Sequence, residues 1–288
     1  VFRDARYIGT WDVDRISKDE LISAMVGREV TQLYPKQAVP IGGTALEVKG
    51  LTKKGYFKDI SFDVKKGEIF GLTGLVGAGR SEVCQGICGL LKPDSGKLYV
   101  GGEECIFTHP SQALKKGVGY LPEDRQQQGL ILSWELYRNM TLSTLDKYNR
   151  LIGIDTGRER QTGKELCEKL QIKAKSIFSR ADSLSGGNQQ KVVFAKLLNS
   201  DVNILLLDEP TKGVDVGAKQ EIFTLINNIA KEGNCVIYAT CENSELLSIT
   251  DRMYVMFDGR ITAELQTAKT SEDEIMHYAT GATSAYTG

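Results

Sequence analysis

Hydrophobic residues along the chain gather in two short continuous runs and one helical stripe. The runs at 69–72 and 204–207 contain no polar side chain, which is typical of strands buried on both faces of a parallel sheet. The stripe lies at 193–198, where apolar residues recur at the spacing of one helix face. The pattern therefore predicts an α/β fold built on a mainly parallel sheet.

The first run leads into a glycine-rich segment, and a helix is expected from Glu82 onward. Strand, glycine loop and helix in this order predict a P-loop, in which backbone N–H groups and the positive end of the helix bind phosphate. Arg80 stands where the P-loop pattern has lysine and carries the charge on a bulkier side chain, while Ser81 is placed to bind Mg²⁺. A glycine-rich turn without function is the alternative that this loop alone leaves open. The candidate phosphate-binding residues are Gly74, Leu75, Val76, Gly77, Ala78, Gly79, Arg80 and Ser81.

The second run ends in two carboxylates, Asp208 and Glu209. Ligands of parallel sheets sit at the carboxyl ends of the strands. Asp208 is expected to hold Mg²⁺ through water, and Glu209 to polarise the water that attacks the γ-phosphate of ATP. A buried strand that ends at a turn would explain either carboxylate alone. Together with the P-loop, the pair predicts an ATPase.

The helical stripe begins with Leu-Ser-Gly-Gly-Asn-Gln-Gln-Lys at residues 184–191. Ser185 is expected to cap the helix, and the two glycines leave backbone N–H groups open to an anion. Followed by the strand that ends in two carboxylates, this segment resembles the LSGGQ-type signature of ABC ATPases. The resemblance implies that five residues here contact nucleotide, namely Ser185, Gly186, Gly187, Asn188 and Gln189.

The resemblance to ABC ATPases implies further site residues, with ATP and Mg²⁺ as the ligands. Tyr56 or Phe57 matches the aromatic residue that stacks on adenine. Glu123 matches the glutamine-loop position, where a catalytic and a Mg²⁺-binding role are expected. Asp215 matches the D-loop, and Cys241 stands at the position of the catalytic switch histidine.

The resemblance covers about residues 45–282 and implies a fold as well. The core is expected to be a P-loop NTPase with a mainly parallel sheet. An antiparallel β portion is expected from about residues 45–73, and an α-helical subdomain from about 124–183.

The two ends of the chain resemble each other. Aligned without a gap, Val1 falls on Val255 and Gly27 on Gly281, with seven identities in twenty-seven positions. Both copies predict a hairpin that turns at an acidic residue, followed by a helix capped by a serine. Coincidence is the weaker explanation, because internal repetition marks duplicated architecture.

The repeat predicts the domain organisation. Residues 1–27 are expected to be the tail of a preceding ABC domain, and residues 28–44, with two prolines and two glycines, a linker. Residues 45–288 then form the ABC nucleotide-binding domain. A start at Val1, without an initiator methionine, agrees with a piece of a longer polypeptide.

Four motifs are similar to the second ATPase domain of bacterial importers for monosaccharides such as ribose, galactose, arabinose and xylose, and to the autoinducer-2 importer ATPase. They are Gly-Ala-Gly-Arg-Ser, Pro-Glu-Asp-Arg, Leu-Ser-Gly-Gly-Asn-Gln-Gln-Lys and Asp-Glu-Pro-Thr-Lys-Gly-Val-Asp. The resemblance implies work at the cytoplasmic face of the cell membrane, with integral membrane permease subunits and, indirectly, a periplasmic or surface solute-binding protein. Trp134 resembles part of the region that receives the membrane subunit, although a solvated helix face with a partly buried tryptophan fits equally well.

The expected P-loop site departs from the ABC pattern at three positions. Arg80 replaces Lys, Glu123 replaces Gln and Cys241 replaces His. Each change removes transition-state stabilisation, because electrostatic positioning supplies most of the catalysis in phosphoryl transfer. In the family, the P-loop of one domain faces the signature helix of the other. We therefore expect this P-loop site to hydrolyse slowly, and the signature segment to complete the active site on the preceding domain.

The composition of the chain limits the classes of partner that it can bind. Lys plus Arg is 36 against 37 for Asp plus Glu, so no net charge draws the chain to nucleic acid. No apolar run approaches the roughly 20 residues that a membrane helix needs. Because acidic and basic residues balance, a soluble tandem ABC protein acting on ribosomes or DNA is disfavoured. A non-catalytic nucleotide-sensing module is favoured by Arg80 and Cys241 and opposed by Asp208 and Glu209.

Overall fold

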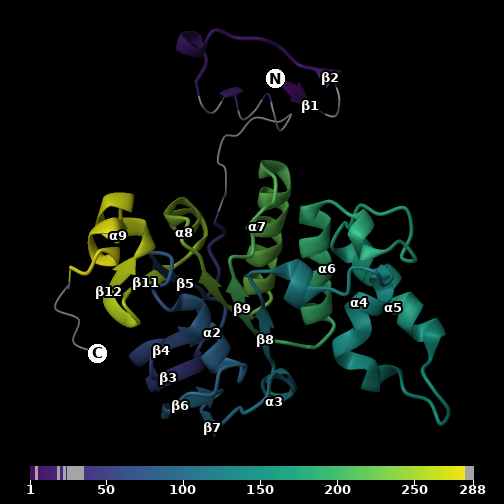
Figure 1. Ribbon diagram of the computed structural model, residues 1–288, viewed down its shortest axis with the longest axis horizontal. Helices are drawn as coiled ribbons and strands as arrows, with labels where there is room; N and C mark the ends of the chain where they lie inside the picture. Colours follow the sequence, from purple (N-terminus) through teal and green to yellow (C-terminus); the bar gives the residue numbers. More distant parts are fainter. Residues whose placement is uncertain (4–5, 18–19, 22–23, 25–35, 283–288) are drawn as a thin grey trace.

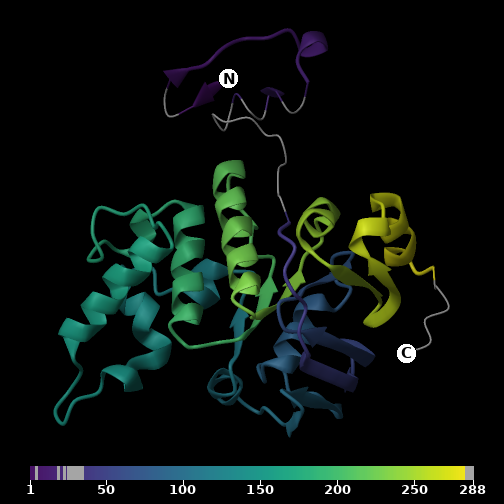
Figure 2. The same ribbon diagram turned by 180° about the vertical axis from the view of Figure 1, so that it is seen from behind.

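The computed structural model describes residues 1–3, 6–17, 20–21, 24 and 36–282. Its main body consists of two sheets and the helices that cover them (Figures 1 and 2). The larger sheet contains β5 (Ile69–Gly74), β8 (Val118–Leu121), β9 (Ile204–Asp208), β10 (Cys235–Ala239), β11 (Arg252–Phe257) and β12 (Arg260–Gln266). The smaller sheet contains β3 (Thr44–Lys53), β4 (Phe57–Lys65), β6 (Ser95–Val100) and β7 (Glu103–Cys105).

The larger sheet has the order β12-β11-β5-β10-β9-β8. Its pairs are parallel except at the edge, where β12 runs antiparallel to β11. The predicted α/β fold with a mainly parallel core sheet is therefore confirmed. The helices of the main body are α2 (Arg80–Ile87), α3 (Pro110–Lys115), α4 (Leu136–Thr141), α5 (Thr156–Lys169), α6 (Gly186–Leu198), α7 (Val216–Lys231), α8 (Asn243–Ile249) and α9 (Glu272–Ala279).

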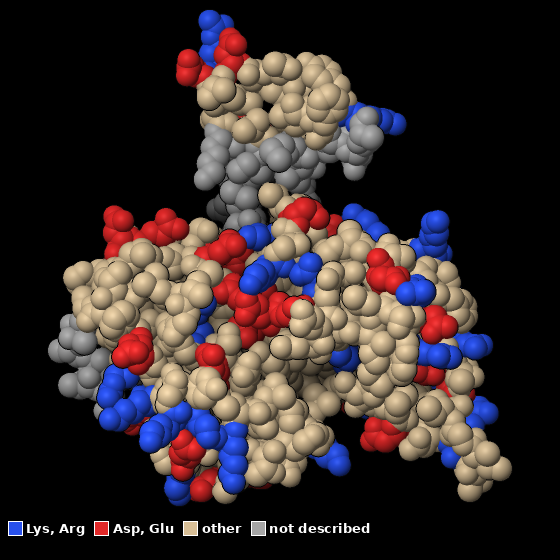
Figure 3. All heavy atoms as spheres, in the orientation of Figure 1, with Lys and Arg blue, Asp and Glu red and all other residues tan. Residues whose placement is uncertain are grey.

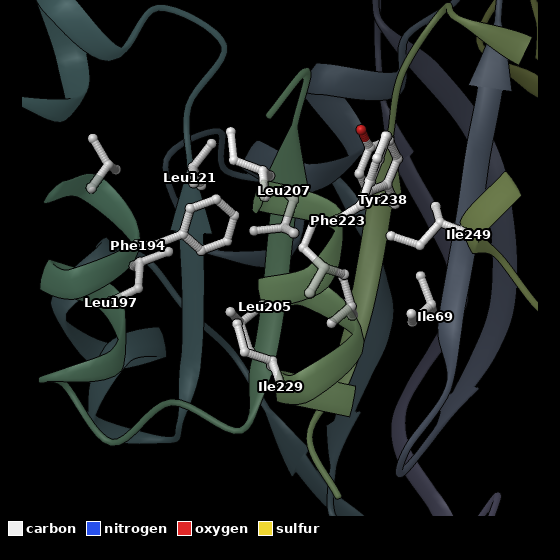
Figure 4. Close-up of a cluster of buried hydrophobic side chains, with 14 of the residues drawn as sticks. Ile69, Leu121, Phe194, Leu197, Leu205, Leu207, Phe223, Ile229, Tyr238 and Ile249 are labelled. Atoms are coloured by element: carbon white, nitrogen blue, oxygen red, sulfur yellow. The ribbon is translucent and has the colours of Figure 1, made fainter. Parts of the chain in front are cut away.

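Hydrophobic clusters on both faces of the larger sheet explain its continuous apolar runs. Leu205 and Leu207 of β9 share one cluster with Phe194 of α6 (Figure 4). The alternate residues, Ile204 and Leu206, pack into the opposite cluster with α2 and the smaller sheet. Successive side chains of a strand point to opposite faces, so a strand covered on both sides is apolar throughout.

The antiparallel portion differs from the expected range of 45–73. The smaller sheet has the order β4-β3-β6-β7, so it includes residues 95–105, while β5 belongs to the parallel sheet. The sequence did not indicate β6 and β7 because most of their side chains are exposed or half-exposed, which leaves no apolar pattern. The expected helical part at 124–183 contains α4 and α5, which lie beside α6 (Figure 1).

Where it is described, the amino-terminal segment has the strand pairing and the 3₁₀ helix of residues 255–269. Strand β1 (Phe2–Arg3) pairs with β2 (Arg6–Tyr7) so that Arg3 faces Arg6, and at the aligned positions Phe257 faces Arg260. The short 3₁₀ helices η1 (Val13–Arg15) and η5 (Thr267–Lys269) also fall on aligned positions.

A serine caps the following helix in both copies. Ser17 Oγ accepts from Glu20 N–H at 3.2 Å, and Ser271 Oγ accepts from Glu274 N–H at 3.3 Å. The predicted hairpin and serine cap are present in both copies. The turn expected at residues 4–5, Gly27 and the first half of the expected linker, 28–35, lie outside the described residues.

Residues 36–43 of the expected linker lie against the main body. Lys36 Nζ forms an ion pair with Asp251 Oδ1 at 2.6 Å, and Gln37 N–H donates to Asn227 Oδ1 at 3.2 Å. The other oxygen of Asp251 accepts from the N–H of Ile69, the first residue of β5, at 2.9 Å. One carboxylate therefore holds both the linker and the start of the P-loop strand. None of the described helices is long and apolar enough to cross a membrane.

A buried arginine joins the two sheets. Arg252 Nε donates to Glu68 Oε1 at 2.6 Å, and its Nη2 donates to the carbonyl of Asp63 on β4 at 2.5 Å. Its Nη1 donates to Glu264 Oε1 on β12 at 3.0 Å. Because the planar guanidinium satisfies three acceptors at once, it fixes β4 against the edge of the larger sheet.

Replacing Arg252 by Met is expected to lower the free energy of unfolding by about 3 kcal/mol, because the change leaves a carboxylate buried without its cation. Glu68 is only 3% exposed. Denaturant unfolding of the chain measures the loss. Arg180→Met, which breaks an ion pair whose arginine and aspartate are 58% and 42% exposed, is the control and should change little. Equal losses for the two variants would contradict the structural role of Arg252.

Candidate functional site

The glycine-rich loop between β5 and α2 has no room for side chains at two of its glycines. Gly74 and Gly79 have φ angles of 148° and 97°. A Cβ at Gly74 would lie 2.3 Å from the carbonyl oxygen of Met256, and one at Gly79 would lie 2.9 Å from that of Tyr56. Glycine is the residue that permits both this backbone conformation and this close approach.

The loop delivers the start of α2, which begins at Arg80. The N–H of Val83 donates to the carbonyl of Gly79 at 3.0 Å, which is the first bond of the helix ladder. The backbone N–H groups before it have no partner within the helix and can bind an anion there. Leu75 and Val76 expose their side chains, so only their backbone is suited to phosphate. The geometry fits a phosphate-binding loop.

The hydroxyl of Ser81 and the carboxylate of Asp208 lie side by side. Ser81 Oγ donates to Asp208 Oδ1 at 2.9 Å, and Tyr120 Oη donates to Oδ2 at 2.9 Å. Burial raises the pKa of Asp208 to about 6, and Glu123 and Glu209 add to this, while the two hydrogen bonds oppose it. Within the described residues no group of three or more His, Cys, Asp or Glu could hold a metal ion. Because the hydroxyl of Ser81 and the carboxylate of Asp208 both offer oxygen atoms, the pair fits Mg²⁺, an ion that keeps several waters and takes phosphate oxygens as further ligands.

One ion pair and two hydrogen bonds hold Glu209. Its Oε1 lies 3.2 Å from Arg80 Nη1 and accepts from the N–H of Cys241 at 2.9 Å. Its Oε2 accepts from Thr240 Oγ1 at 2.8 Å. The side chains of Arg80 and Glu209 are only 9% and 12% exposed. The buried cation of Arg80 therefore neutralises Glu209 in this arrangement.

Cys241 contributes its backbone to the site, since its N–H holds Glu209. Partial burial and the charge of Glu209 raise the pKa of its thiol, and Arg80 opposes them. A neutral thiol is a weak donor and carries no charge. The Cys241 side chain therefore cannot replace the cationic imidazole expected at this position.

Of the two aromatic candidates for adenine, only Tyr56 is accessible. Its side chain is half-exposed, and its carbonyl lies beside Gly79 of the P-loop. Phe57 is 2% exposed and packs in the hydrophobic core close to Gly86 of α2. The structure therefore favours Tyr56 as the adenine platform.

Two further candidate residues are engaged by neighbours. Glu123 Oε1 pairs with Lys212 Nζ. Its negative charge acts on Asp208 by helping to raise the pKa of that carboxyl. Asp215 Oδ1 accepts from the N–H of Ala218 at 2.9 Å and caps α7.

The signature segment forms the start of α6. Ser185 stands at the N-cap position but makes no side-chain cap bond, so the expected capping by Ser185 is wrong. Its Oγ accepts instead from Asn188 Nδ2 at 2.9 Å, and Asn188 Oδ1 accepts from the N–H of Lys173 at 2.8 Å. A Cβ at Gly187 would lie 2.3 Å from the Cβ of Ala218. The glycine therefore allows α6 to pack closely on α7.

Gln189 is buried, with 4% of the residue exposed, whereas Ser185 at the start of the signature is exposed. Its Oε1 accepts from Gln126 Nε2 at 3.1 Å, and its Nε2 donates to the carbonyl of Ala181 at 3.1 Å. Gln189 thus braces the helical part in this arrangement. Among the described residues, no hydrogen bond or ion pair joins residues 185–189 to the P-loop.

A family model described as "ABC transporter" matches residues 57–212. This stretch is more than half of the chain and contains the P-loop, the signature segment and the two carboxylates that follow β9. The chain belongs to the ABC transporter family.

Relatives in this family are similar over nearly the whole chain. The ribose import ATP-binding protein RbsA of Halalkalibacterium halodurans is 42% identical over 281 residues, which are 98% of this chain and 56% of that protein. A putative ribose/galactose/methyl galactoside import ATP-binding protein of Geobacillus kaustophilus is 44% identical, again over 98% of this chain and 56% of that protein. The chain thus spans about half the length of the curated relatives it matches.

Solved structures show the same fold. A nucleotide-free ATP-binding cassette from an ABC transporter is 22% identical, with a TM-score of 0.69 over 82% of this chain and 95% of that chain. An ATP-binding cassette in a dimeric post-hydrolysis state, bound to ADP and Pi, is 24% identical, with a TM-score of 0.66 over 77% of this chain and 98% of that chain. The predicted ABC ATPase architecture is confirmed.

Several side chains at the site were not predicted from the sequence. Tyr120 holds Asp208, Thr240 holds Glu209, and Lys212 holds Glu123. Arg125 donates to the carbonyl of Lys212 at 2.6 Å. Arg125 and Lys212 belong to motifs that stood out in the sequence, but a motif does not reveal which side chains meet across strands.

Asp208→Asn is expected to stabilise the ligand-free chain at pH 8, by at most about 3 kcal/mol. Burial raises the folded pKa of this acid above 3.8 to about 6, so the parent loses stability as the pH rises through that range. The difference between parent and variant should vanish below about pH 4. Denaturant unfolding between pH 4 and pH 8 measures it.

Asp94→Asn is the control for this pH dependence, because the hydrogen bond from Lys53 lowers the pKa of Asp94. Its effect should have the opposite sign, with the parent more stable than the variant above pH 4. A difference between parent and Asp208→Asn that did not depend on pH would contradict a penalty from buried charge.

Proposed function

We propose that this chain is the second nucleotide-binding domain of a tandem ABC protein that hydrolyses ATP to drive import of a monosaccharide or a sugar-like solute. The observation that carries the ATPase assignment is the meeting of Arg80 and Ser81, from the P-loop, with Asp208 and Glu209 at the end of β9. The solute class rests on the relatives, which are named for import of ribose, galactose or methyl galactoside.

The tandem arrangement is supported by two independent observations. Residues 1–21 repeat the hairpin, 3₁₀ helix and serine cap of residues 255–275 at aligned positions. The relatives are nearly twice as long as the part that this chain matches. We therefore propose that residues 1–27 end a preceding ABC domain and that residues 28–44 link it to the domain from 45 onward.

In the proposed cycle, the P-loop amides and the start of α2 bind the phosphates of ATP, and Tyr56 stacks on adenine. Ser81 and Asp208 would hold Mg²⁺, which would neutralise charge on the phosphate oxygens. Arg80 turns from Glu209 to the phosphates, and Glu209 then orients the attacking water. Since Cys241 supplies no cation, the transition state at this site is poorly stabilised and hydrolysis is slow.

The signature segment serves the other site. Ser185 is exposed and Gly186 half-buried at the start of α6, where unpaired backbone N–H groups can bind the phosphates of a facing nucleotide. This half of the protein would thus complete the active site on the preceding domain while binding ATP more passively in its own.

The proposed partners are integral membrane permease subunits at the cytoplasmic face of the membrane, with a solute-binding protein acting through them. A groove of about 600 Å³ lies between α2, α3, β8 and α6 and has a largely apolar lining. It is suited to an apolar segment of the permease. Trp134 lies outside this lining and is 37% exposed. The lining includes Leu90, Pro110, Leu114, Pro122, Val193 and Leu197.

A non-catalytic nucleotide-sensing module is the second candidate, because Glu209 is engaged in an ion pair with Arg80. Work on ribosomes or DNA has less support. Acidic and basic side chains are mixed on the face seen in Figure 3, whereas nucleic-acid binding needs a basic stripe.

The two sites should respond differently to mutation of this domain. In the full-length protein, purified with its membrane subunits, Glu209→Gln is expected to keep near-parent ATPase, because the other site hydrolyses. Ser185→Arg should lower ATPase at least about tenfold, because it blocks phosphate contacts of that site. Steady-state ATPase measures both, and Gln161→Arg on the exposed face of α5 is the control. Activity lost in Glu209→Gln and kept in Ser185→Arg would reverse the assignment.

Arg80→Lys is expected to improve this domain's own site, because a compact ammonium binds phosphate and leaves Glu209 free. In the Ser185→Arg background, where the other site is silent, residual ATPase should rise roughly two- to tenfold. Adding Glu209→Gln to this double variant should abolish the gain. A residual rate that is unchanged by Arg80→Lys would show that the pairing of Arg80 with Glu209 does not limit hydrolysis.

A further inference from the structure

Arg125 lies where the glutamine-loop, D-loop and signature segments of the chain meet. Its Nη1 donates to the carbonyl of Lys212 at 2.6 Å, and its Nη2 donates to the carbonyl of Gly213 at 3.3 Å. These two carbonyls belong to adjacent peptide groups just before the Asp215 cap of α7. A planar fork can serve both, whereas a lysine side chain offers a single nitrogen.

The start of the signature helix rests on the same guanidinium. A Cβ at Gly186 would lie 2.7 Å from Arg125 Nη2 and 2.9 Å from the carbonyl oxygen of Gly213. Next to it, Gln126 Nε2 donates to Gln189 Oε1 at 3.1 Å. The first turn of α6 is therefore in contact with both the arginine and the carbonyl that the arginine holds.

The segment that carries Arg125 is anchored on its other side as well. Arg125 opens a single π-helical turn, η2 (Arg125–Gly129), and Asp124 Oδ1 accepts from the backbone N–H groups of Gln126 and Gln127 at 3.0 and 3.1 Å. Glu123, directly before this turn, pairs with Lys212. Residues 123–126 and 212–213 are thus joined by one ion pair and two hydrogen bonds.

This arrangement has an electrostatic cost. Arg125 Nε is buried and has no hydrogen-bond partner among the described residues, and burial lowers the pKa of the guanidinium, against the field of Asp124. A partly buried cation whose donors are incompletely paired is less stable than the same group in water. The contacts with the two carbonyls compensate for this cost only while the three segments stay in place, so a displacement of one segment changes the energy of the others.

We propose that Arg125 is a positioning residue for the ATP site on the preceding domain. It holds residues 212–215 and the first turn of α6 in register with the glutamine-loop segment, so that a shift of residues 123–126 moves the signature segment that completes that site. The proposal rests on the proposed function, in which residues 185–188 face the other nucleotide.

The test uses the full-length protein purified with its membrane subunits. Arg125→Lys is expected to lower the kcat for ATP at least about tenfold, because small displacements of positioned groups are costly, and to leave the KM for ATP within about twofold of the parent value. Nucleotide binding at this domain's own P-loop should be unchanged. Arg180→Lys, an exposed arginine of the same helical part that pairs with Asp182, is the control and should match the parent.

A second readout separates positioning from general stability. Hydrogen exchange in the same protein should rise together at residues 185–189 and 212–215 in Arg125→Lys, with no change in the P-loop at 74–81. A parent-like kcat would overturn the proposal, and so would exchange that rises uniformly over the domain. If the parent itself hydrolysed no ATP, the proposed function would fall, while the exchange pattern would still decide the role of Arg125.

Discussion

Two adjacent carboxylates at the end of a fully buried strand set the physical constraint on this molecule. Charges in such a place are tolerated only when they are paired and hydrogen-bonded. Asp208 accepts hydrogen bonds from one hydroxyl of the P-loop and one of β8. Glu209 forms an ion pair with the P-loop arginine and accepts hydrogen bonds from a threonine hydroxyl and a backbone N–H at the end of β10. The strand order β5-β10-β9-β8 brings these donors together, so the fold and the site satisfy the same requirement.

Much of this arrangement could be predicted from the sequence because it depends on local pattern. The apolar run at 204–207 and the glycines of 74–79 each carry a strong physical signature, and parallel strands place their carboxyl ends at one edge. The amino-terminal repeat was also visible, since a hairpin and a serine cap need only a few residues. These features are encoded by neighbours along the chain.

Other features depend on contacts between distant residues and left no pattern. The choice between Tyr56 and Phe57 was decided by which ring the core covers. Gln189 looked like part of the ligand contact, but its amide is used by the helical part. Ser185 stands at the expected cap position, yet Asn188 donates to its hydroxyl. In each case the sequence indicates which groups are available, and the packing decides which partner each one meets.

The carboxylate of Asp251 has a mechanical consequence. It binds Lys36 with one oxygen and the N–H of Ile69 with the other, and β5 runs from Ile69 straight to Gly74 at the phosphate loop. A pull on the chain before Lys36 therefore reaches Asp251 and the first residue of this strand before it reaches β3, the strand that residues 36–43 lead into. The phosphate loop lies at the other end of the strand whose first residue Asp251 holds.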